Sequence, residues 1–303
     1  MVSRIATFAN TNMLIQASMN LQAKLTDQQT QESSGVKTTS FSGLKGDAGK
    51  LLDLQGQATR LQAESDMATS AAADVQSAYS AVSNITDLTT TIRSQLSAAL
   101  SNTSATTPLI SAADAQGWLQ TLQSELNTEV GGRYVFSGQA VDRPPVDFSN
   151  PAYAPAADPT TPDTSYFSGT DTTRRLATTT GTTIDISVSA DSSGFEKLAR
   201  ALSMIASAPT DKTELGAAYD LATSALTDLG ATQATLSNQA AALDTVSSDN
   251  TVKITTLKNL AHDLTGADLS TAAVMVTQYT TQLEAVYGSI GQLSNVSILK
   301  YLT

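Results

Sequence analysis

The residue types that most often carry enzymatic chemistry are scarce in this 303-residue chain, which has one histidine and no cysteine. Thiol nucleophiles and thiolate metal sites are therefore excluded. His262 stands beside Asp263 in the segment KNLAHDLTG, near the end of a predicted helix. Adjacent helical residues do not face each other, whereas a histidine in the last helical turn complements the helix dipole. The sequence thus favours a structural role for His262 over catalysis.

Two further patterns could bind a ligand, and both fall short of the required spacing. GLKGDAGK at residues 43–50 has Leu44 where a phosphate-binding loop needs glycine, and Leu51 where it needs Ser or Thr. Asp163, Asp171 and Asp185 lie among Ser and Thr residues without the spacing of a calcium loop, so they are interpreted as turn-forming residues. We therefore predict no enzyme, no catalytic residue, no cofactor and no metal site.

The charge balance disfavours two classes of partner. Seventeen Lys and Arg residues against 28 Asp and Glu give a net charge of −11, whereas phosphate binding requires clustered cations. No apolar run approaches the roughly 20 residues that cross a bilayer. The N-terminus MVSRIATFANTNMLIQ lacks the uninterrupted apolar region of a cleaved signal peptide. We expect no nucleic-acid binding, no membrane insertion, and export, if any, by a route without such a peptide.

The elements that must position these residues are mostly helices, and the C-terminal one has the clearest pattern. Apolar positions recur there with alternating spacings of three and four, which is typical of a coiled-coil seam. Asp268 precedes the pattern as a candidate N-cap. The predicted seam consists of Leu269, Ala272, Val276, Tyr279, Leu283, Val286, Ile290 and Leu293.

The N-terminal segment shows a shorter seam that mirrors the C-terminal one. It is formed by Ile5, Phe8, Asn12, Ile15 and Met19, and Leu21 and Leu25 continue it on a neighbouring stripe. Similar periodicity predicts long helices over about residues 54–100 and 211–263 and a shorter one over 112–126. Residues 34–50 are expected to form a loop. The seams of the two chain ends have no other partner, so we expect the ends to come together.

The middle of the chain changes in character, because Pro, Gly and Thr become frequent and the periodicity falls to two. Residues 134–136 and 183–188 are predicted strands. The expected fold is mainly α, an elongated antiparallel coiled-coil helical bundle formed by the N- and C-terminal halves, with a small β-rich insert. The predicted domains are residues 1–42 plus 266–303 (terminal coiled coil), 43–131 plus 194–265 (helical bundle) and 132–193 (surface insert).

The segment GGRYVFSG at residues 131–138 resembles a signature of the hook–filament junction proteins in the flagellin superfamily, carried here by Gly132, Arg133, Tyr134, Phe136 and Gly138. It follows a helix and precedes the Pro-rich VDRPPVDF, as in that family. The N-terminal stretch ANTNMLIQASMNLQAKLTDQQTQESSG resembles the first helix of that family and of flagellins. LSNQAAALDTV and the C-terminal seam ending in SILKYL resemble the returning half of the same fold. SFSGLKGDAGK departs from the turn that the family often shows after its first helix.

The resemblance implies a structural component of the bacterial flagellum that joins hook to filament by stacking with neighbouring axial subunits. It implies as partners the hook-side junction protein, filament flagellin, further copies in a ring or helical layer, and an export chaperone. The implied location is extracellular, after flagellar type III export. Two alternatives stay open, a filament-forming flagellin and an exported coiled-coil adhesin or translocator. We expect residues 1–35 and about 270–303 to fold by packing against neighbouring subunits.

Overall fold

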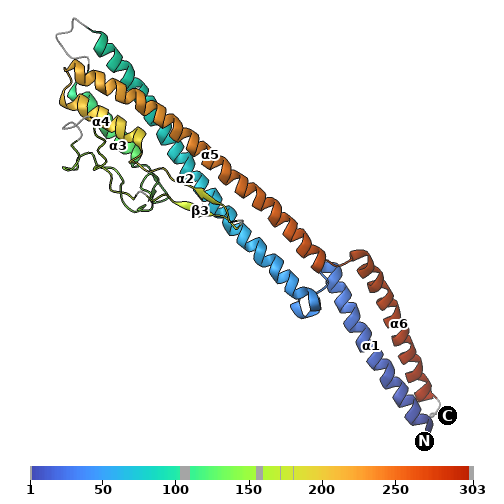
Figure 1. Ribbon diagram of the computed structural model, residues 1–303. Coiled ribbons are helices and arrows are strands. Elements are labelled where there is room, and N and C mark those ends of the chain that lie inside the picture. The colour runs from blue at the N-terminus through green and yellow to red at the C-terminus, as the bar shows by residue number, and fades with distance from the viewer. Residues whose placement is uncertain (1, 103–109, 155–159, 171, 180, 300–303) are drawn as a thin grey trace. The chain divides into compact units, whose positions relative to one another are not determined.

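The computed structural model describes residues 2–102, 110–154, 160–170, 172–179 and 181–299, with the backbone alone for residues 2–9, 45 and 294–299. The chain divides into two compact units, residues 1–59 with 253–303 and residues 60–252. Figure 1 gives the order of the elements along the chain. The first unit contains the predicted terminal coiled coil, and the second contains the predicted insert.

Two long helices form the framework of the second unit, and both agree with the predicted ranges. They are α2 (Ala48–Ser101) and α5 (Lys212–Thr265). Ser65 hydroxyl lies 3.1 Å from that of Ser247, and Lys212 Nζ donates to the carbonyl of Asn102 at 2.8 Å, so the helices run antiparallel. One face of α5 is buried, and it consists of Leu215, Ala218, Ala222, Ala225, Leu229, Leu236 and Leu243.

Two shorter helices pack against each other beside this framework. Helix α3 (Ala112–Leu126) has the predicted bounds and begins with a reciprocal capping box between Ser111 and Asp114. Helix α4 (Ser193–Ser207) is missing from the sequence-based expectations, although its apolar residues follow the period of an amphipathic helix. Short polar turns bound α4 on both sides. The segment before it is predicted as part of the insert, and the segment after it as part of the long helix.

The insert contains two small antiparallel hairpins, and its strands are shorter than predicted. Strands β1 (Glu129–Val130) and β2 (Arg133–Tyr134) form one hairpin, and β3 (Arg175–Ala177) and β4 (Thr183–Asp185) form the other. The expectation of strand at 135–136 is wrong, as is that at 186–188. Ser137 hydroxyl donates to the Tyr134 carbonyl at 2.9 Å, which marks a turn that directs the chain inward.

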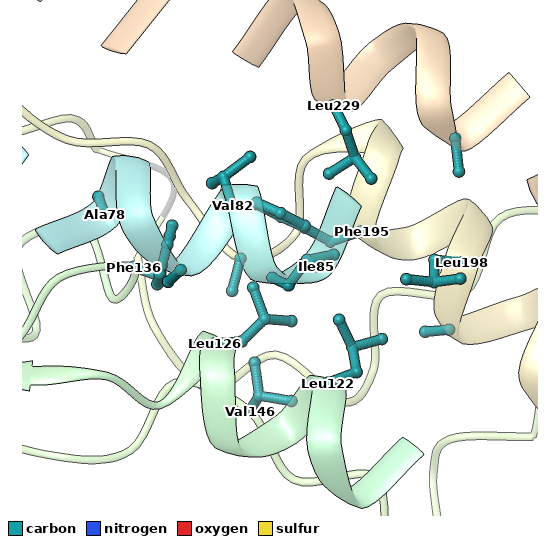
Figure 2. Close-up of a cluster of buried hydrophobic side chains, with 14 of the residues drawn as sticks. Ala78, Val82, Ile85, Leu122, Leu126, Phe136, Val146, Phe195, Leu198 and Leu229 are labelled. Atoms are coloured by element: carbon teal, nitrogen blue, oxygen red, sulfur yellow. The ribbon is translucent and has the colours of Figure 1, made fainter. Parts of the chain in front are cut away.

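Side chains from four helices and the insert meet in one hydrophobic core. Figure 2 shows this cluster, to which α2, α3, α4, α5 and the insert all contribute. Because its members come from segments far apart in the sequence, the core ties the insert to the helices of the second unit. The labelled members are Ala78, Val82, Ile85, Leu122, Leu126, Phe136, Val146, Phe195, Leu198 and Leu229.

The first unit is built on the pair of terminal helices, α1 (Val2–Ser34) and α6 (Leu269–Leu299), which pack side by side (Figure 1). Asp268 caps α6 as predicted, because its carboxylate accepts from the Thr271 amide at 3.1 Å. Helix α1 ends at Gly35, whose φ of 71° suits glycine. The predicted loop 34–50 instead contains a 3-10 helix, η1 (Phe41–Asp47), and the start of α2.

A short bridge joins the ends of α1 and α5 within this unit. Val36 and Gly266 pair as an antiparallel bridge, with the Lys37 amide donating to the Thr265 carbonyl at 2.7 Å. Lys37 Nζ also donates to the Leu264 carbonyl at 3.1 Å. A cation at the C-terminal end of a helix satisfies otherwise unpaired carbonyls and complements the helix dipole. The bridge therefore fixes the point at which both helices end.

Candidate functional site

Helix α1 uses a different stripe against α6 from the main predicted seam. Its less exposed positions are Thr11, Leu14, Ser18, Leu21, Leu25 and Gln28, again with alternating spacings of three and four. Ile15 is 41% exposed and Met19 55% exposed, while Asn12 is also exposed. The side chains of Ile5 and Phe8 lie outside the described residues. Leu21 and Leu25, noted as a neighbouring stripe, lie on the contact face.

The cause of this difference lies in the two adjacent apolar stripes that α1 carries. The stripe of Leu14, Leu21 and Leu25 has the small Ser18 at its centre, so α6 can approach closely there. The stripe of Ile15 and Met19 is then left turned away from α6, and Met13 is exposed on another face of the helix. A single sequence shows both stripes, but only the partner helix decides which of them is covered within one chain.

On α6 the half-buried positions follow the heptad spacing through almost its whole length. Ala272 and Leu283 are buried, and Val276, Tyr279, Val286, Ile290 and Leu293 are partly covered. Leu269 is different, because it stands at the first position of the helix and is 50% exposed. Val274 and Tyr287 lie exposed on other faces. Glu284 is the one charged residue of α6, so the pair presents an unusually uncharged surface.

The GGRYVFSG segment begins with a tight turn. Gly131 and Gly132 have φ values of 58° and 81°, a region that non-glycine residues rarely adopt, and this turn joins β1 to β2. Arg133 and Tyr134 form β2, and Arg133 Nη2 lies 3.2 Å from Asp74 Oδ2 on α2. The first half of the segment therefore builds a hairpin and attaches it to the bundle.

The second half of the segment enters the core. Phe136 is fully buried and meets Phe195 of α4 edge to face, with ring centroids 5.7 Å apart. Gly138 has a φ of 66°, and the Thr170 carbonyl lies so close that a Cβ at this position would collide with it. The role of these residues is thus to fix where the helical half ends and the insert begins.

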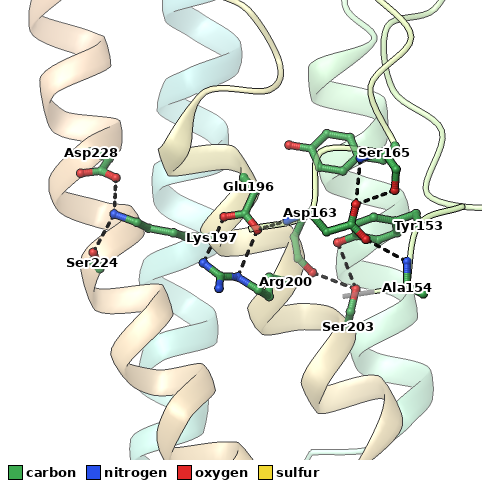
Figure 3. Close-up of polar contacts among 12 residues, drawn as sticks. Tyr153, Ala154, Asp163, Ser165, Glu196, Lys197, Arg200, Ser203, Ser224 and Asp228 are labelled. Carbon is green, nitrogen blue, oxygen red and sulfur yellow. Dashed lines mark hydrogen bonds and ion pairs between the residues drawn. The ribbon is translucent and has the colours of Figure 1, made fainter. Parts of the chain in front are cut away.

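Helix α4 connects to the insert through a buried polar group. Glu196 pairs with Arg200, Oε1 to Nε at 3.1 Å, and also accepts the Asp163 amide at 3.1 Å. Tyr153 hydroxyl lies 3.2 Å from that of Ser203 (Figure 3). Burial raises the pKa of the Tyr153 phenol well above its ordinary value, so the hydroxyl stays neutral and keeps this hydrogen bond.

Three of the residues considered for chemistry, Asp163, Asp185 and His262, occupy structural positions. Burial would raise the pKa of Asp163, but hydrogen bonds from Ser165 and Ala154 outweigh it and lower the pKa. Asp185 pairs with Arg175 at 2.7 Å, and Asp171 lies outside the described residues. Exposed His262 stands in the last turn of α5. Across the described ranges, no three His, Asp or Glu residues gather in a way that could hold a metal.

A lysine also links α4 to α5. Lys197 Nζ lies 2.6 Å from Asp228 Oδ2 and donates to the Ser224 hydroxyl at 3.0 Å (Figure 3). The bonds from Lys197 and from Ser193 lower the pKa of the Asp228 carboxyl. This contact, like α4 itself, is not among the features predicted from the sequence.

Among the helices of the described chain, none has the length and apolar character to cross a membrane.

Comparisons with known proteins agree with this architecture. Residues 5–141 match the family described as the bacterial flagellin N-terminal helical region. A protein of Vibrio parahaemolyticus assigned as a flagellar hook-associated protein has a TM-score of 0.56 and 15% identity, covering 71% of this chain and 96% of its own. FlgL from Bacillus cereus has a TM-score of 0.50 and 10% identity, covering 65% and 97%. No curated protein sequence matches the chain. The predicted resemblance to the flagellin superfamily is confirmed.

Proposed function

We propose that this flagellin-superfamily chain is a structural component of the bacterial flagellum that joins the hook to the filament by stacking with neighbouring axial subunits. The observation that carries the proposal is the pair α1 and α6, in which helices from both ends of the chain leave apolar side chains exposed. Ile15, Met19 and Val274 are such residues. Exposed apolar side chains of this kind are candidates for contact with another protein.

The proposed partners follow from this arrangement and from the family. They are a hook-side junction protein, filament flagellin, further copies of this chain in a ring or helical layer, and an export chaperone. Contacts between copies that do not close on themselves generate tubes or filaments. We place the protein outside the cell, exported by the flagellar type III pathway without a cleaved signal peptide. The seam residues, including Leu269 and Leu293, are proposed to meet neighbouring subunits directly or to support those that do.

A filament-forming flagellin is the second candidate, because the family match covers only the N-terminal helical region that flagellins possess. Two features favour the junction role. The GGRYVFSG segment resembles the junction signature, and the insert of about 60 residues is short. Electron microscopy of the purified protein under polymerising conditions separates the candidates, since a flagellin forms long filaments and a junction protein stops at a thin layer.

Deletion of the gene tests the proposal directly. Loss of a junction protein should leave hooks without filaments and release filament subunits into the medium. Immunoblots of the medium and electron micrographs of the cells give both results. Normal filaments on the hooks of the deletion strain would overturn the proposal, and absence of filament subunits from both cell surface and medium would favour the flagellin alternative.

A further inference from the structure

One buried carboxylate on α2 joins both hairpins of the insert to the bundle. Asp74 has a side chain only 8% exposed. Its Oδ2 atom lies 2.8 Å from Nη2 of Arg174, the residue that precedes β3, and 3.2 Å from Nη2 of Arg133 in β2. Two guanidinium groups from separate hairpins thus share a single carboxylate oxygen.

The two arginines hold this oxygen unequally. The Arg174 side chain is 11% exposed and makes the shorter contact, whereas that of Arg133 is 46% exposed. Removing one partner of a buried ion pair leaves the other charge without compensation in a low-dielectric surrounding, which is strongly destabilising. Removing the half-exposed Arg133 should have little effect on stability, because the buried Arg174 still compensates the charge of Asp74. Arg174 alone is therefore sufficient to neutralise Asp74.

Arg133 is then a surplus cation at the edge of this site. The three groups together carry one net positive charge, in a chain that has 28 acidic and 17 basic residues. A second copy of this chain presents many more carboxylates than cations. A half-exposed guanidinium fork can form a bidentate pair with such a carboxylate, and Arg174 would still hold the insert in place.

We infer that Arg174 is the permanent partner of Asp74, and that Arg133 is an exchangeable arm that pairs with a carboxylate on a neighbouring copy of this chain during assembly. The assignment of the neighbour rests on the proposed function. Ion-pair exchange of this kind needs no movement of the bundle, because only the Arg133 side chain changes partner. It also gives the Arg of the GGRYVFSG segment a role that monomer stability does not require.

The first test uses the soluble full-length protein and amide hydrogen exchange in residues 174–186. Arg174→Ala should speed exchange there by about tenfold or more, because Asp74 becomes buried without its main partner. Arg133→Ala should change it by less than about threefold. An equal increase in the exchange rate for the two variants would overturn the assignment of different roles to Arg174 and Arg133. If Arg174→Ala does not fold, the apolar pair Asp74→Leu with Arg174→Met should restore slow exchange in that segment.

The second test measures assembly in cells that carry the same variants. Arg133→Ala should release filament subunits into the medium at least about threefold above wild type, given the energy of one charge-assisted pair, while the secreted variant stays folded. Arg175→Ala is the control, because it removes an equally charged, exposed insert residue. Release at the wild-type level by Arg133→Ala would overturn the exchangeable arm. If that result occurs while the deletion strain has bare hooks, only the role of Arg133 is wrong and the junction role stands. If the deletion strain has normal filaments, the junction role itself is wrong.

Discussion

At the scale of single residues, the GGRYVFSG segment owes its residue types to packing and backbone geometry. Phe136 fills the core between α2 and α4, and the glycines occupy positions with positive φ. Asp163 accepts hydrogen bonds in a turn, Asp185 pairs with Arg175, and His262 stands at a helix end. The residue-scale predictions therefore concern stability, and each uses a matched control within the chain.

Phe136→Ala should lower the free energy of unfolding by about 3–5 kcal/mol, because it leaves a cavity in a fully enclosed core. The edge-to-face contact with Phe195 is lost as well. Denaturant unfolding followed by circular dichroism measures the change. Tyr79→Ala is the control, since Tyr79 is 37% exposed on α2 and its loss should cost far less. Equal costs for the two variants would contradict this account of the core.

Gly138→Ala should be more damaging than Gly131→Ala. Both glycines have positive φ, so each substitution introduces backbone strain of roughly 1–2 kcal/mol. Only at Gly138 would the new methyl group also meet Thr170, whereas nothing lies near Gly131. We expect a lower denaturation midpoint for Gly138→Ala than for Gly131→Ala. The reverse order would show that the turn of the β1–β2 hairpin is the more constrained site.

At the scale of elements, α4 is the connector of the second unit. It packs against α3, contributes Phe195 and Leu198 to the core, and reaches α5 through Lys197 and Asp228. Glu196 on another side of α4 holds a backbone amide of the insert. One helix of fifteen residues therefore links three other parts of the fold, and its contacts should be visible in the pH dependence of stability.

Asp228→Asn should reduce stability at neutral pH and remove part of its acid dependence. The pKa of Asp228 is lowered below 3.8 in the folded protein, so its carboxylate stabilises the fold above that pH. This contribution is lost as the pH falls through the folded pKa. Melting temperatures of the variant and wild type should differ at pH 7 and converge as the pH falls through the folded pKa. Asp220→Asn, an exposed change on the same helix, should behave like wild type; a difference that persists in acid would contradict the mechanism.

At the scale of the whole molecule, the two chain ends form a unit whose outer surface is too apolar and too weakly charged for a helix pair that stays alone in water. The inner stripe of α1 is covered within the chain, and Ile15 and Met19 of the outer stripe stay exposed. The terminal helices are also rich in Ser, Thr and Asn, which are mediocre helix formers. Both properties predict that assembly completes this unit.

Replacing Ile15 and Met19 together by Gln should impair assembly and leave the monomer nearly unchanged. Both side chains face away from α6, so surface substitutions of this kind alter stability by about 0.5 kcal/mol or less each. Filament retention on cells and circular dichroism of the purified variant provide the two measurements. Met67→Gln, an exposed change in the second unit, is the control. Full filament retention by the double variant would exclude these residues from the subunit contact.

Limited proteolysis of the soluble monomer should cleave residues 1–35 and 270–303 before the body of residues 60–252. The body has a continuous hydrophobic core, while the terminal pair has one narrow contact face, and local opening is easiest where few apolar contacts are buried. Mass spectrometry of the early fragments identifies the sites. The expectation fails if both termini resist cleavage as long as the body does.

The sequence by itself determined the elements whose periodicity is long and regular. The bounds of α3, the extent of α5 and the heptad positions of α6 could all be predicted, because three or more turns of one apolar stripe leave little freedom of register. Short elements are harder to predict from the sequence. Strand at residues 135–136 was wrong and α4 was missed, since a few residues of local pattern are easily overruled by tertiary contacts.

Only the tertiary structure decided which surfaces face each other. The choice between the two stripes of α1 depends on α6, more than 230 residues away in the sequence. The convergence of Arg133 and Arg174 on Asp74 depends on the folding of two hairpins against one helix. Periodicity is a local property of the chain, and long-range pairing is a property of the folded whole. For that reason the sequence indicated the periodic helices, and the structure showed which of their apolar residues are covered within the chain and which stay exposed.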